Sequence, residues 1–403
     1  MLRRLVFPLL LALWVVAIPQ EGVAQSIDHL FQQGNAAQIA GDFAEAERVF
    51  RQIIELDPNS AYAYNNLGNA LYGQGQLEEA IGAYRQALQL PDQPGTPVSA
   101  HTLAHDNLGF ALWLQGKLEE AIAEFERAIQ LNPTYASAYN NMGNALYDQG
   151  QIEEAIAAYT RSTKLDPAYA DAYNNLGFAL SQQGRLDEAI VAYNQAIEIY
   201  PEFTFAYNNL GYALSQLGRF EEAIMTYRQA LALPDQDGTP TTAHTLAHIN
   251  LGYIYRLQGD LDAAIAEFRQ AIELDSRYVL AHSNLGSALR EQGKFEEAIA
   301  SFRRAIELDP NYAPAYNGLG NALYGQGRVE EAIANYRQAL ELPDQQGSPA
   351  SAHTLAHNNL GLVLLEQGNV EEAIVEFRRA LELSPNFIDA QFNLQEAQQQ
   401  LLP

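Results

Sequence analysis

Residues 61–89 read AYAYNNLGNALYGQGQLEEAIGAYRQALQ and contain one complete copy of a pattern that predicts the architecture. Tyr64, Leu67, Gly68 and Leu71 lie at positions i, i+3, i+4 and i+7, which places them on one face of a helix. Gly68 occupies that face although glycine costs a helix about 1 kcal/mol relative to alanine. We therefore expect a neighbouring element to approach Gly68 too closely to leave room for a side chain.

The second half of the stretch predicts a second helix that folds back on the first. Gly75 suits the left-handed residue that ends a helix. Proline follows the second helix in most copies of this pattern and would end it, as Pro58, Pro133 and Pro167 do. A second apolar stripe lies between these signals, at Leu77, Ala80, Ile81, Tyr84 and Leu88. The stretch thus predicts an antiparallel pair of helices.

The same pattern occurs ten times, and glycine sets its register. Counted from each marker glycine, Gly stands at position +7, Ala at +12 and Phe or Tyr at +16. The numbers of successive markers differ by 34, except for differences of 41 after repeats 2, 6 and 9. One helix pair cannot bury its own apolar face, so stacked copies predict a solenoid. The marker glycines are Gly34, Gly68, Gly109, Gly143, Gly177, Gly211, Gly252, Gly286, Gly320 and Gly361.

This pattern resembles the tetratricopeptide repeat family over residues 27–385. The resemblance implies an all-α fold, an α-solenoid in which antiparallel helix pairs stack into a right-handed superhelix. It also implies an interaction scaffold without naming a ligand. Residues 386–403 predict a C-terminal capping helix, in which Ile388, Phe392 and Leu394 cover the last repeat.

Residues 1–24 have the pattern of a signal peptide. Arg3 and Arg4 precede an apolar run over residues 5–18, and the small residues Gly22 and Ala24 suit cleavage after Ala24. The run is shorter than the roughly 20 residues that span a bilayer, although an uncleaved N-terminal anchor is the alternative. We expect an exported protein, periplasmic or secreted, without stable membrane insertion after cleavage.

Composition excludes several classes of function. The 403 residues contain no cysteine and carry a formal charge of −26. The first fact excludes disulfides, thiolate metal sites and a cysteine nucleophile. The second argues against nucleic acid as a partner, because phosphate binding depends on Lys and Arg. Walker and Gly-x-Ser-x-Gly motifs are missing. We therefore expect no enzyme and no cofactor, whereas homo-oligomers of such similar repeats are left open.

Asparagine recurs two residues before the marker glycine in eight of the ten repeats. Within the family the first helix of each repeat lines the concave surface, and this position resembles the asparagine ladder in the repeat domain of O-linked N-acetylglucosamine transferase, where amides hold a peptide main chain. The resemblance implies a peptide-binding groove that also contains nearby aromatic residues. The alternatives are a helix-to-helix hydrogen-bonding role and, for the aromatics, carbohydrate binding. The candidate residues are Asn66, Asn107, Asn141, Asn175, Asn209, Asn250, Asn284, Asn359, Tyr72, Trp113, Tyr147, Phe178, Tyr212 and Tyr253.

The three longer spacings each contain a seven-residue insert. Pro-Asp-x-x-Gly favours a turn, and Thr96, Thr239 and Ser348 then predict N-caps that start the next helix more than a turn early. Each insert precedes His-Thr-Leu-Ala-His, whose histidines share one helix face. We favour a packing or hydrogen-bonding role for them, with metal binding as the alternative. The pairs are His101/His105, His244/His248 and His353/His357.

Overall fold

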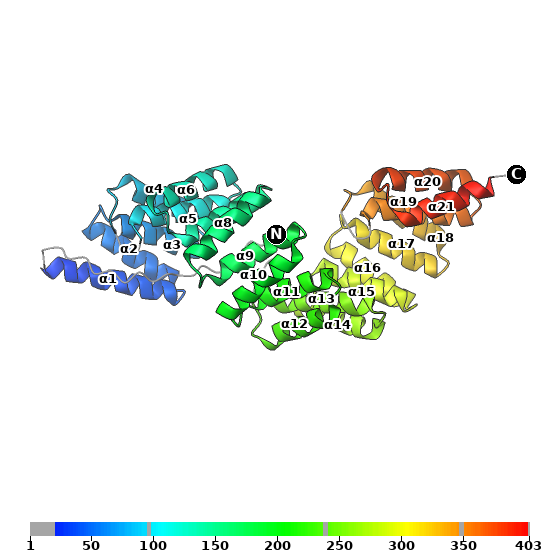
Figure 1. Cartoon of the computed structure of the whole chain (residues 1–403), viewed down its shortest axis with the longest axis horizontal. Coiled ribbons are helices and arrows are strands. Elements are labelled where there is room, and N and C mark those ends of the chain that lie inside the picture. The colour runs from blue at the N-terminus through cyan, green and yellow to red at the C-terminus, as the bar shows by residue number, and fades with distance from the viewer. Residues whose placement is uncertain (1–20, 95–97, 237–240, 346–349, 402–403) are drawn as a thin grey trace. The chain divides into compact units, whose positions relative to one another are not determined.

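The computed structural model describes residues 21–94, 98–236, 241–345 and 350–401, and within these ranges it is built from helices without strands (Figure 1). The chain divides at Gly218 into two compact units, called unit 1 and unit 2 below. The predicted all-α solenoid is confirmed. Most of the predicted signal peptide, residues 1–20, lies outside the described residues.

The helices of the two units have the following bounds. Unit 1 contains α1 (Glu21–Ile39), α2 (Phe43–Leu56), α3 (Ala61–Gly73), α4 (Leu77–Gln89), α5 (Ala100–Leu114), α6 (Leu118–Leu131), α7 (Ala136–Asp148), α8 (Ile152–Leu165), α9 (Ala170–Gln182), α10 (Leu186–Ile199) and α11 (Thr204–Gln216). Unit 2 contains α12 (Phe220–Ala232), α13 (Ala243–Leu257), α14 (Leu261–Leu274), α15 (Val279–Glu291), α16 (Phe295–Leu308), α17 (Ala313–Gly325), α18 (Val329–Glu341), α19 (Ala352–Glu366), α20 (Val370–Leu383) and α21 (Ile388–Gln400).

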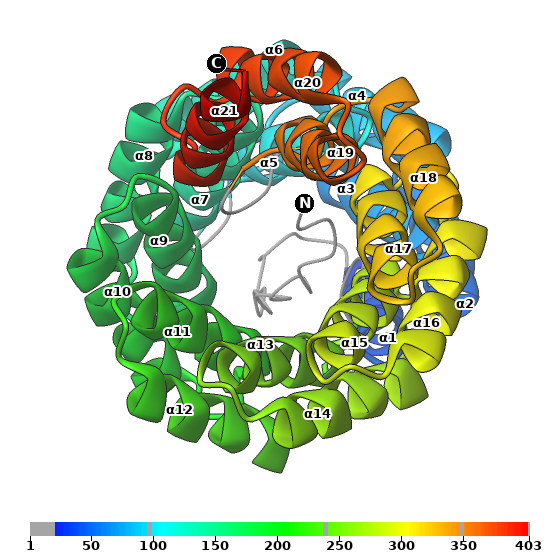
Figure 2. The same cartoon turned by 90° about the vertical axis from the view of Figure 1, so that its right-hand side faces the viewer.

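Within each unit the helices form two layers. The odd-numbered helices, which are the first helices of the repeats, lie on the inner side, and the even-numbered helices lie outside them (Figure 2). Helix α3, for example, packs on α4 of its own repeat and on α5 of the next. The alanines at position +12 from the markers are fully buried, as Ala80 and Ala121 illustrate. Side chains of successive first helices therefore lie beside one another along the inner layer.

The marker glycines are fixed by close packing, as the sequence predicts. A Cβ atom on Gly68 would lie 2.3 Å from Cε1 of Tyr84, which is the aromatic residue at position +16. Gly143 faces Tyr159 in the same way at 2.6 Å. The glycines that end the first helices also behave as predicted, since Gly75 has a φ of 79°.

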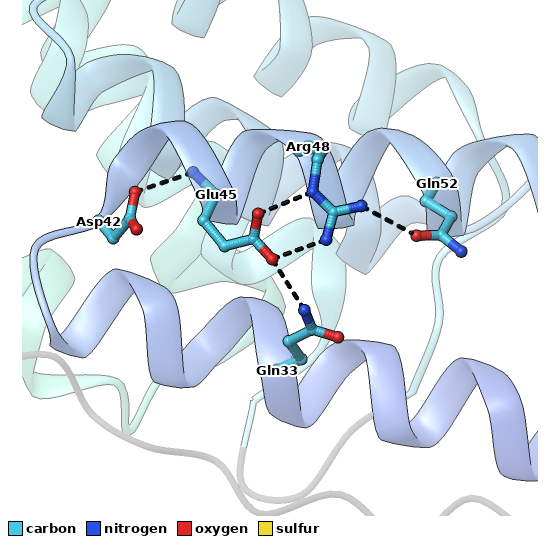
Figure 3. A network of polar contacts seen from close by, with 5 residues as sticks. All are labelled: Gln33, Asp42, Glu45, Arg48 and Gln52. Atoms are coloured by element: carbon cyan, nitrogen blue, oxygen red, sulfur yellow. Dashed lines mark hydrogen bonds and ion pairs between the residues drawn. The ribbon is translucent and has the colours of Figure 1, made fainter.

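Polar contacts join the two helices of the first repeat (Figure 3). Asp42 caps α2 by accepting a hydrogen bond from the amide of Glu45 at 3.0 Å. The Glu45 carboxylate accepts two hydrogen bonds from Arg48, at 2.6 and 2.7 Å, and one from Nε2 of Gln33 on α1 at 2.8 Å. The hydrogen bond from Arg48 holds the pKa of Glu45 below its usual range.

Two local predictions are wrong. The helices after the inserts begin at Ala100, Ala243 and Ala352, and their N-caps are Ser99, Thr242 and Ser351 instead of Thr96, Thr239 and Ser348. The Ser99 side chain accepts from the amide of Thr102, so a capping residue nearer the helix replaces the expected one. These helices therefore begin two residues earlier than the first helices of the other repeats, and not more than a turn earlier as predicted.

The C-terminal helix also differs from the prediction. Leu394 is partly buried against the core, but Ile388 and Phe392 are 75 % and 65 % exposed. Ala390, Asn393 and Ala397 are the residues of α21 that face the last repeat. Phe392 stands at the repeat position of Asn140 and Asn358, which the first helix of the following repeat covers. No described helix follows α21 to cover Phe392.

Candidate functional site

The predicted asparagines form a ladder of hydrogen bonds between successive first helices of unit 1. Each donates from Nδ2 to an oxygen on the preceding first helix, and the acceptor lies three residues before the marker glycine of that helix. The rungs are Asn107 to Asn65 at 2.9 Å, Asn141 to Asp106 at 3.0 Å, Asn175 to Asn140 at 3.0 Å and Asn209 to Asn174 at 2.9 Å. Asn66 instead donates to Asn35 at 3.3 Å.

The ladder is incomplete in unit 2. Asn359 donates to Asn317 at 3.0 Å, and Asn393 of α21 donates to Asn358 at 2.8 Å. Asn284 on α15 is half-buried and has no hydrogen bond to a described residue, because Ile249 occupies the acceptor position on α13. Asn250 lies half-buried on α13. The structure thus gives the helix-to-helix role to six of the predicted asparagines.

These contacts fix the orientation of the amides. Asn107 and Asn175 are 8 % and 7 % exposed. Because Nδ2 of Asn107, Asn175 and Asn209 donates to the neighbouring helix, Oδ1 is the atom that can accept a hydrogen bond from a ligand. None of these three Oδ1 atoms has a partner among the described residues. The sequence shows a second asparagine directly before the predicted one in five repeats, as at Asn65 and Asn140, but its role as the acceptor of the next rung was not predicted.

The predicted aromatic residues of unit 1 gather in pairs along the inner layer. The rings of Tyr72 and Phe110 have centroids 5.8 Å apart, and those of Tyr147 and Phe178 are 5.3 Å apart. Tyr212 on α11 is 44 % exposed. Trp113 is only 5 % exposed and donates from its indole nitrogen to Asp148 at 2.8 Å, so it supports the neighbouring rings and offers little surface.

At the same repeat positions, unit 2 carries charged groups. Arg256 lies over the ring of Tyr253, 5.4 Å from its centroid, and forms an ion pair with Glu291 at 2.8 Å. Tyr324 donates to the Glu366 carboxylate. Burial and this carboxylate raise the pKa of Tyr324 to about 12. Arg256 is therefore neutralised by Glu291 within the inner layer of unit 2.

One rung contains a buried carboxyl group. Asp106 is 2 % exposed and occupies the place where Asn65, Asn140 and Asn174 stand in neighbouring repeats. It accepts from Asn141 at 3.0 Å and from the hydroxyl of Ser137 at 3.0 Å. Burial raises the pKa of the Asp106 carboxyl to about 6, although the hydrogen bonds from Asn141 and Ser137 act in the opposite direction.

The histidine pairs have structural partners. Nε2 of His101 contacts the main-chain oxygen of Leu90 at 2.9 Å, and Nδ1 of His105 contacts Oε2 of Glu124 at 2.6 Å. The same two contacts recur at 2.9 and 2.6 Å for His244 and His248, and at 2.8 and 2.6 Å for His353 and His357. Within the described ranges no three His, Cys, Asp or Glu side chains cluster as a metal site. The favoured packing and hydrogen-bonding role accounts for these contacts.

The glutamates in these contacts escaped the sequence analysis, although a signal for them exists. Glu124, Glu267 and Glu376 stand directly before the aromatic residue at position +16 in the three repeats whose first helix has His-Thr-Leu-Ala-His. Repeats with tyrosine in place of the second histidine have Ala, Thr or Asn there, for example Ala158 opposite Tyr139. Pairing the two positions across repeats would have identified the contact.

Among the described helices, none is long and apolar enough to cross a membrane.

Three family models match the chain. The model of the cilia and flagella-associated protein 70 C-terminal domain matches residues 22–237. A TPR repeat model matches residues 252–289 and 286–327, and a tetratricopeptide repeat model matches residues 317–386. No curated protein matches the chain.

Solved structures show the same fold at low identity. A monomeric mutant of IFIT1 with Gppp-AAAA has a TM-score of 0.53 at 17 % identity, covering 88 % of this chain and 85 % of that one. The human IFIT1 dimer with PPP-AAAA has a TM-score of 0.53 at 16 % identity, covering 89 % and 85 %. A tetratricopeptide repeat protein from Parabacteroides merdae has a TM-score of 0.52 at 19 % identity, covering 65 % and 98 %. These structures share the fold, and the family models show that the chain belongs to the tetratricopeptide repeat family, its first half matching the cilia and flagella-associated protein 70 C-terminal domain.

Proposed function

We propose that this protein is an exported, non-enzymatic scaffold whose inner layer binds extended segments of other proteins. The observation that carries the proposal is the pairing of fixed amide oxygens with aromatic rings along unit 1. Asn65 and Asn140 hold the amides of Asn107 and Asn175. The oxygens of these two amides match the N–H groups of an extended main chain. Because their orientation is set before binding, little conformational entropy is lost when a peptide is bound.

The aromatic residues add apolar surface beside these acceptors. Tyr147, Phe178 and Tyr212 lie on α7, α9 and α11, which are successive first helices. Rigid aromatic side chains provide large contact areas with few rotatable bonds. The amide acceptors contact the main chain and do not select a sequence, and the rings accept many apolar side chains. We therefore expect this surface to bind many different peptide sequences. The Gppp-AAAA and PPP-AAAA ligands belong to IFIT1, and the charge of −26 on this chain disfavours RNA.

The test removes the rings with residues that the chain itself uses at the same repeat positions. Tyr147 becomes Ser, as in Ser181, and Tyr212 becomes Ser, as in Ser287. Phe178 becomes Asn, as in Asn144, which accepts a hydrogen bond from Tyr159 at 2.8 Å. A matched control changes exposed residues of α10 and its C-cap, with Val191→Ala and Tyr200→Asn.

Partners are captured from the exported fraction, the bound segments are identified by mass spectrometry, and synthetic peptides of those segments are measured by fluorescence anisotropy. We expect the triple variant to weaken peptide binding at least tenfold and the control to leave it unchanged, with equal helicity by circular dichroism. Equal binding by all three proteins would contradict the inner layer as the site. Capture of glycans without any peptide would instead favour carbohydrate binding.

A further inference from the structure

A second candidate surface lies on the outer layer of unit 1. A hollow of about 630 Å³ is open to solvent between α6 and α8, with α7 beneath it. Ile122, Met142, Leu146 and Ala158 supply apolar surface in this hollow. We call it the α6–α8 hollow.

Other repeats carry different side chains at two of the positions that line this space. Tyr139 stands at position −4 from the marker Gly143, and Ala158 stands directly before the aromatic Tyr159. In repeat 3 the same positions hold His105 and Glu124, which contact each other at 2.6 Å. Repeats 7 and 10 have the same contact. Ala158 thus leaves the hollow without the glutamate that the chain carries at this position in three other repeats.

The charges around the hollow have one predominant sign. Glu119, Glu126 and Glu154 line it, are exposed, and come from both α6 and α8. Arg161 also lines it, but its guanidinium lies over the ring of Tyr139, 5.9 Å from the ring centroid. An occupant therefore meets an apolar floor between carboxylates on two sides.

We propose that the α6–α8 hollow docks a basic peptide segment of a partner protein. One bulky apolar side chain of the segment enters the hollow, and Lys or Arg residues on both sides of it lie against the three glutamates. Met142 adapts the floor to side chains of different shape, since its unbranched chain has several rotatable bonds. This site is independent of the inner layer, so failure of one proposal leaves the other intact.

The probe is a fluorescein-labelled peptide, Gly-Lys-Lys-Leu-Phe-Lys-Lys-Gly, titrated with the purified protein and followed by anisotropy. A second peptide replaces Leu-Phe by Ser-Ser and keeps the charge. We expect the apolar peptide to bind at least tenfold more tightly, and its affinity to fall with salt because exposed charges are screened. Equal binding of both peptides would overturn the proposal, because it would show attraction to an acidic protein alone.

The decisive variant is Tyr139→His with Ala158→Glu, which copies the native pair of repeat 3 into repeat 4. It fills the hollow and adds a negative charge. Docking in the hollow and simple attraction to acidic groups therefore predict opposite changes in peptide affinity. Docking in the hollow predicts at least a tenfold loss for the apolar peptide. Unchanged or tighter binding would overturn the proposal. Circular dichroism and thermal unfolding establish that the variant is folded.

A milder variant keeps the test usable if the pair does not fold. Ala157→Met narrows the hollow with the residue found at the equivalent Met225, and Ala300→Met is the matched control in unit 2. We expect Ala157→Met to bind the apolar peptide several-fold more weakly and Ala300→Met to bind it as the parent protein does. Equal affinities of the two variants would contradict the α6–α8 hollow as the binding site.

The charges are tested separately by Glu119→Gln, Glu126→Gln and Glu154→Gln together. The control removes three exposed carboxylates of unit 2, with Glu330→Gln, Glu371→Gln and Glu372→Gln. We expect at least fivefold weaker binding for the first triple variant only. An equal loss in both would show that net charge, and not the rim of the hollow, attracts the peptide.

Discussion

The two units join their first helices by different means. In unit 1 the amide ladder is continuous from α3 to α11, whereas the largest buried apolar cluster extends only from α1 to α7. In unit 2 the largest apolar cluster runs from α14 to α21, across the place where Gly318 interrupts the ladder. Directional hydrogen bonds extend beyond the largest cluster in unit 1, and apolar packing continues through the gap in the ladder in unit 2.

This difference has a consequence for function. A ladder sets the register of the helices and orients amide oxygens on the inner layer, whereas no described hydrogen bond holds the amide of Asn284 at the gap in unit 2. Unit 1 therefore combines acceptors with aromatic rings, and unit 2 has Arg256, paired with Glu291, at the repeat position of Tyr72 and Tyr147. Repeats that share one backbone pattern thus have different surfaces, which is how a repeated fold acquires a specific site.

The largest expected effect comes from Asp106, the charged member of the unit 1 ladder. Its folded-state pKa of about 6 lies above the roughly 3.9 of an unfolded aspartate, so the folded state binds the proton more tightly between these values. Stability from this group is therefore greatest at low pH and falls as the pH rises through 4 to 6. Asp106→Asn removes the charge, and we expect up to about 3 kcal/mol of added stability at pH 7.

The geometry of the next rung supports this substitution. Asn140 accepts from Asn175 at 3.0 Å, and its Nδ2 lies 3.5 Å from the hydroxyl of Tyr169, as Tyr135 lies beside Asp106. Urea unfolding at pH 7 and pH 5 measures the effect, and the gain should fall by about half at pH 5. A gain that is independent of pH would show that ionisation of Asp106 is not its cause.

The second effect concerns the interruption in unit 2. Gly318 stands where eight repeats have asparagine, and a Cβ atom there would lie 2.3 Å from the ring of Phe302. Gly318→Asn therefore introduces a side chain into space that the ring fills, and we expect a loss of about 2 kcal/mol in urea unfolding.

A matched glycine separates crowding from helix propensity. Gly82 in α4 is exposed and has nothing within 4 Å of an added Cβ, so Gly82→Ala should stabilise unit 1 by up to about 1 kcal/mol. Stabilisation by Gly318→Asn would mean that the ring moves aside and that the interruption is not enforced by packing.

The sequence predicted the repeat itself because each of its marks has a local physical cause. Gly68 and Gly75 report crowding and a left-handed turn, and both act within one helix pair. The acceptor of each rung and the partner of each histidine belong to another helix, so one repeat read alone does not contain them. The division at Gly218 has no local mark, since the spacing of the glycines continues through it.

The sequence predicted the repeat positions of the candidate site residues, but it did not predict how exposed their side chains are. Trp113 shares its repeat position with Tyr72 and Tyr147, but hydrogen bonding to Asp148 and contact with Phe110 bury it. Ile388 and Phe392 follow the apolar pattern of a covered face, which no described helix covers. Burial depends on which neighbour is present, and that information lies outside the helix that carries the residue.

The smallest expected effect compares one rung of unit 1 with the same position in unit 2. Asn175→Ala removes donors to Asn140 and Asn144 and leaves the buried Oδ1 of Asn140 without this donor. We expect a loss of about 1 kcal/mol, because an unsatisfied buried acceptor costs at least that much. Asn284→Ala should change the free energy of unfolding by only a few tenths of a kcal/mol, since Asn284 has no described hydrogen bond to lose.

Urea unfolding of both variants, with helicity checked by circular dichroism, makes the comparison. Equal losses at the two positions would mean that this asparagine stabilises its own helix, and the ladder would then be a result of stacking and not a cause of it.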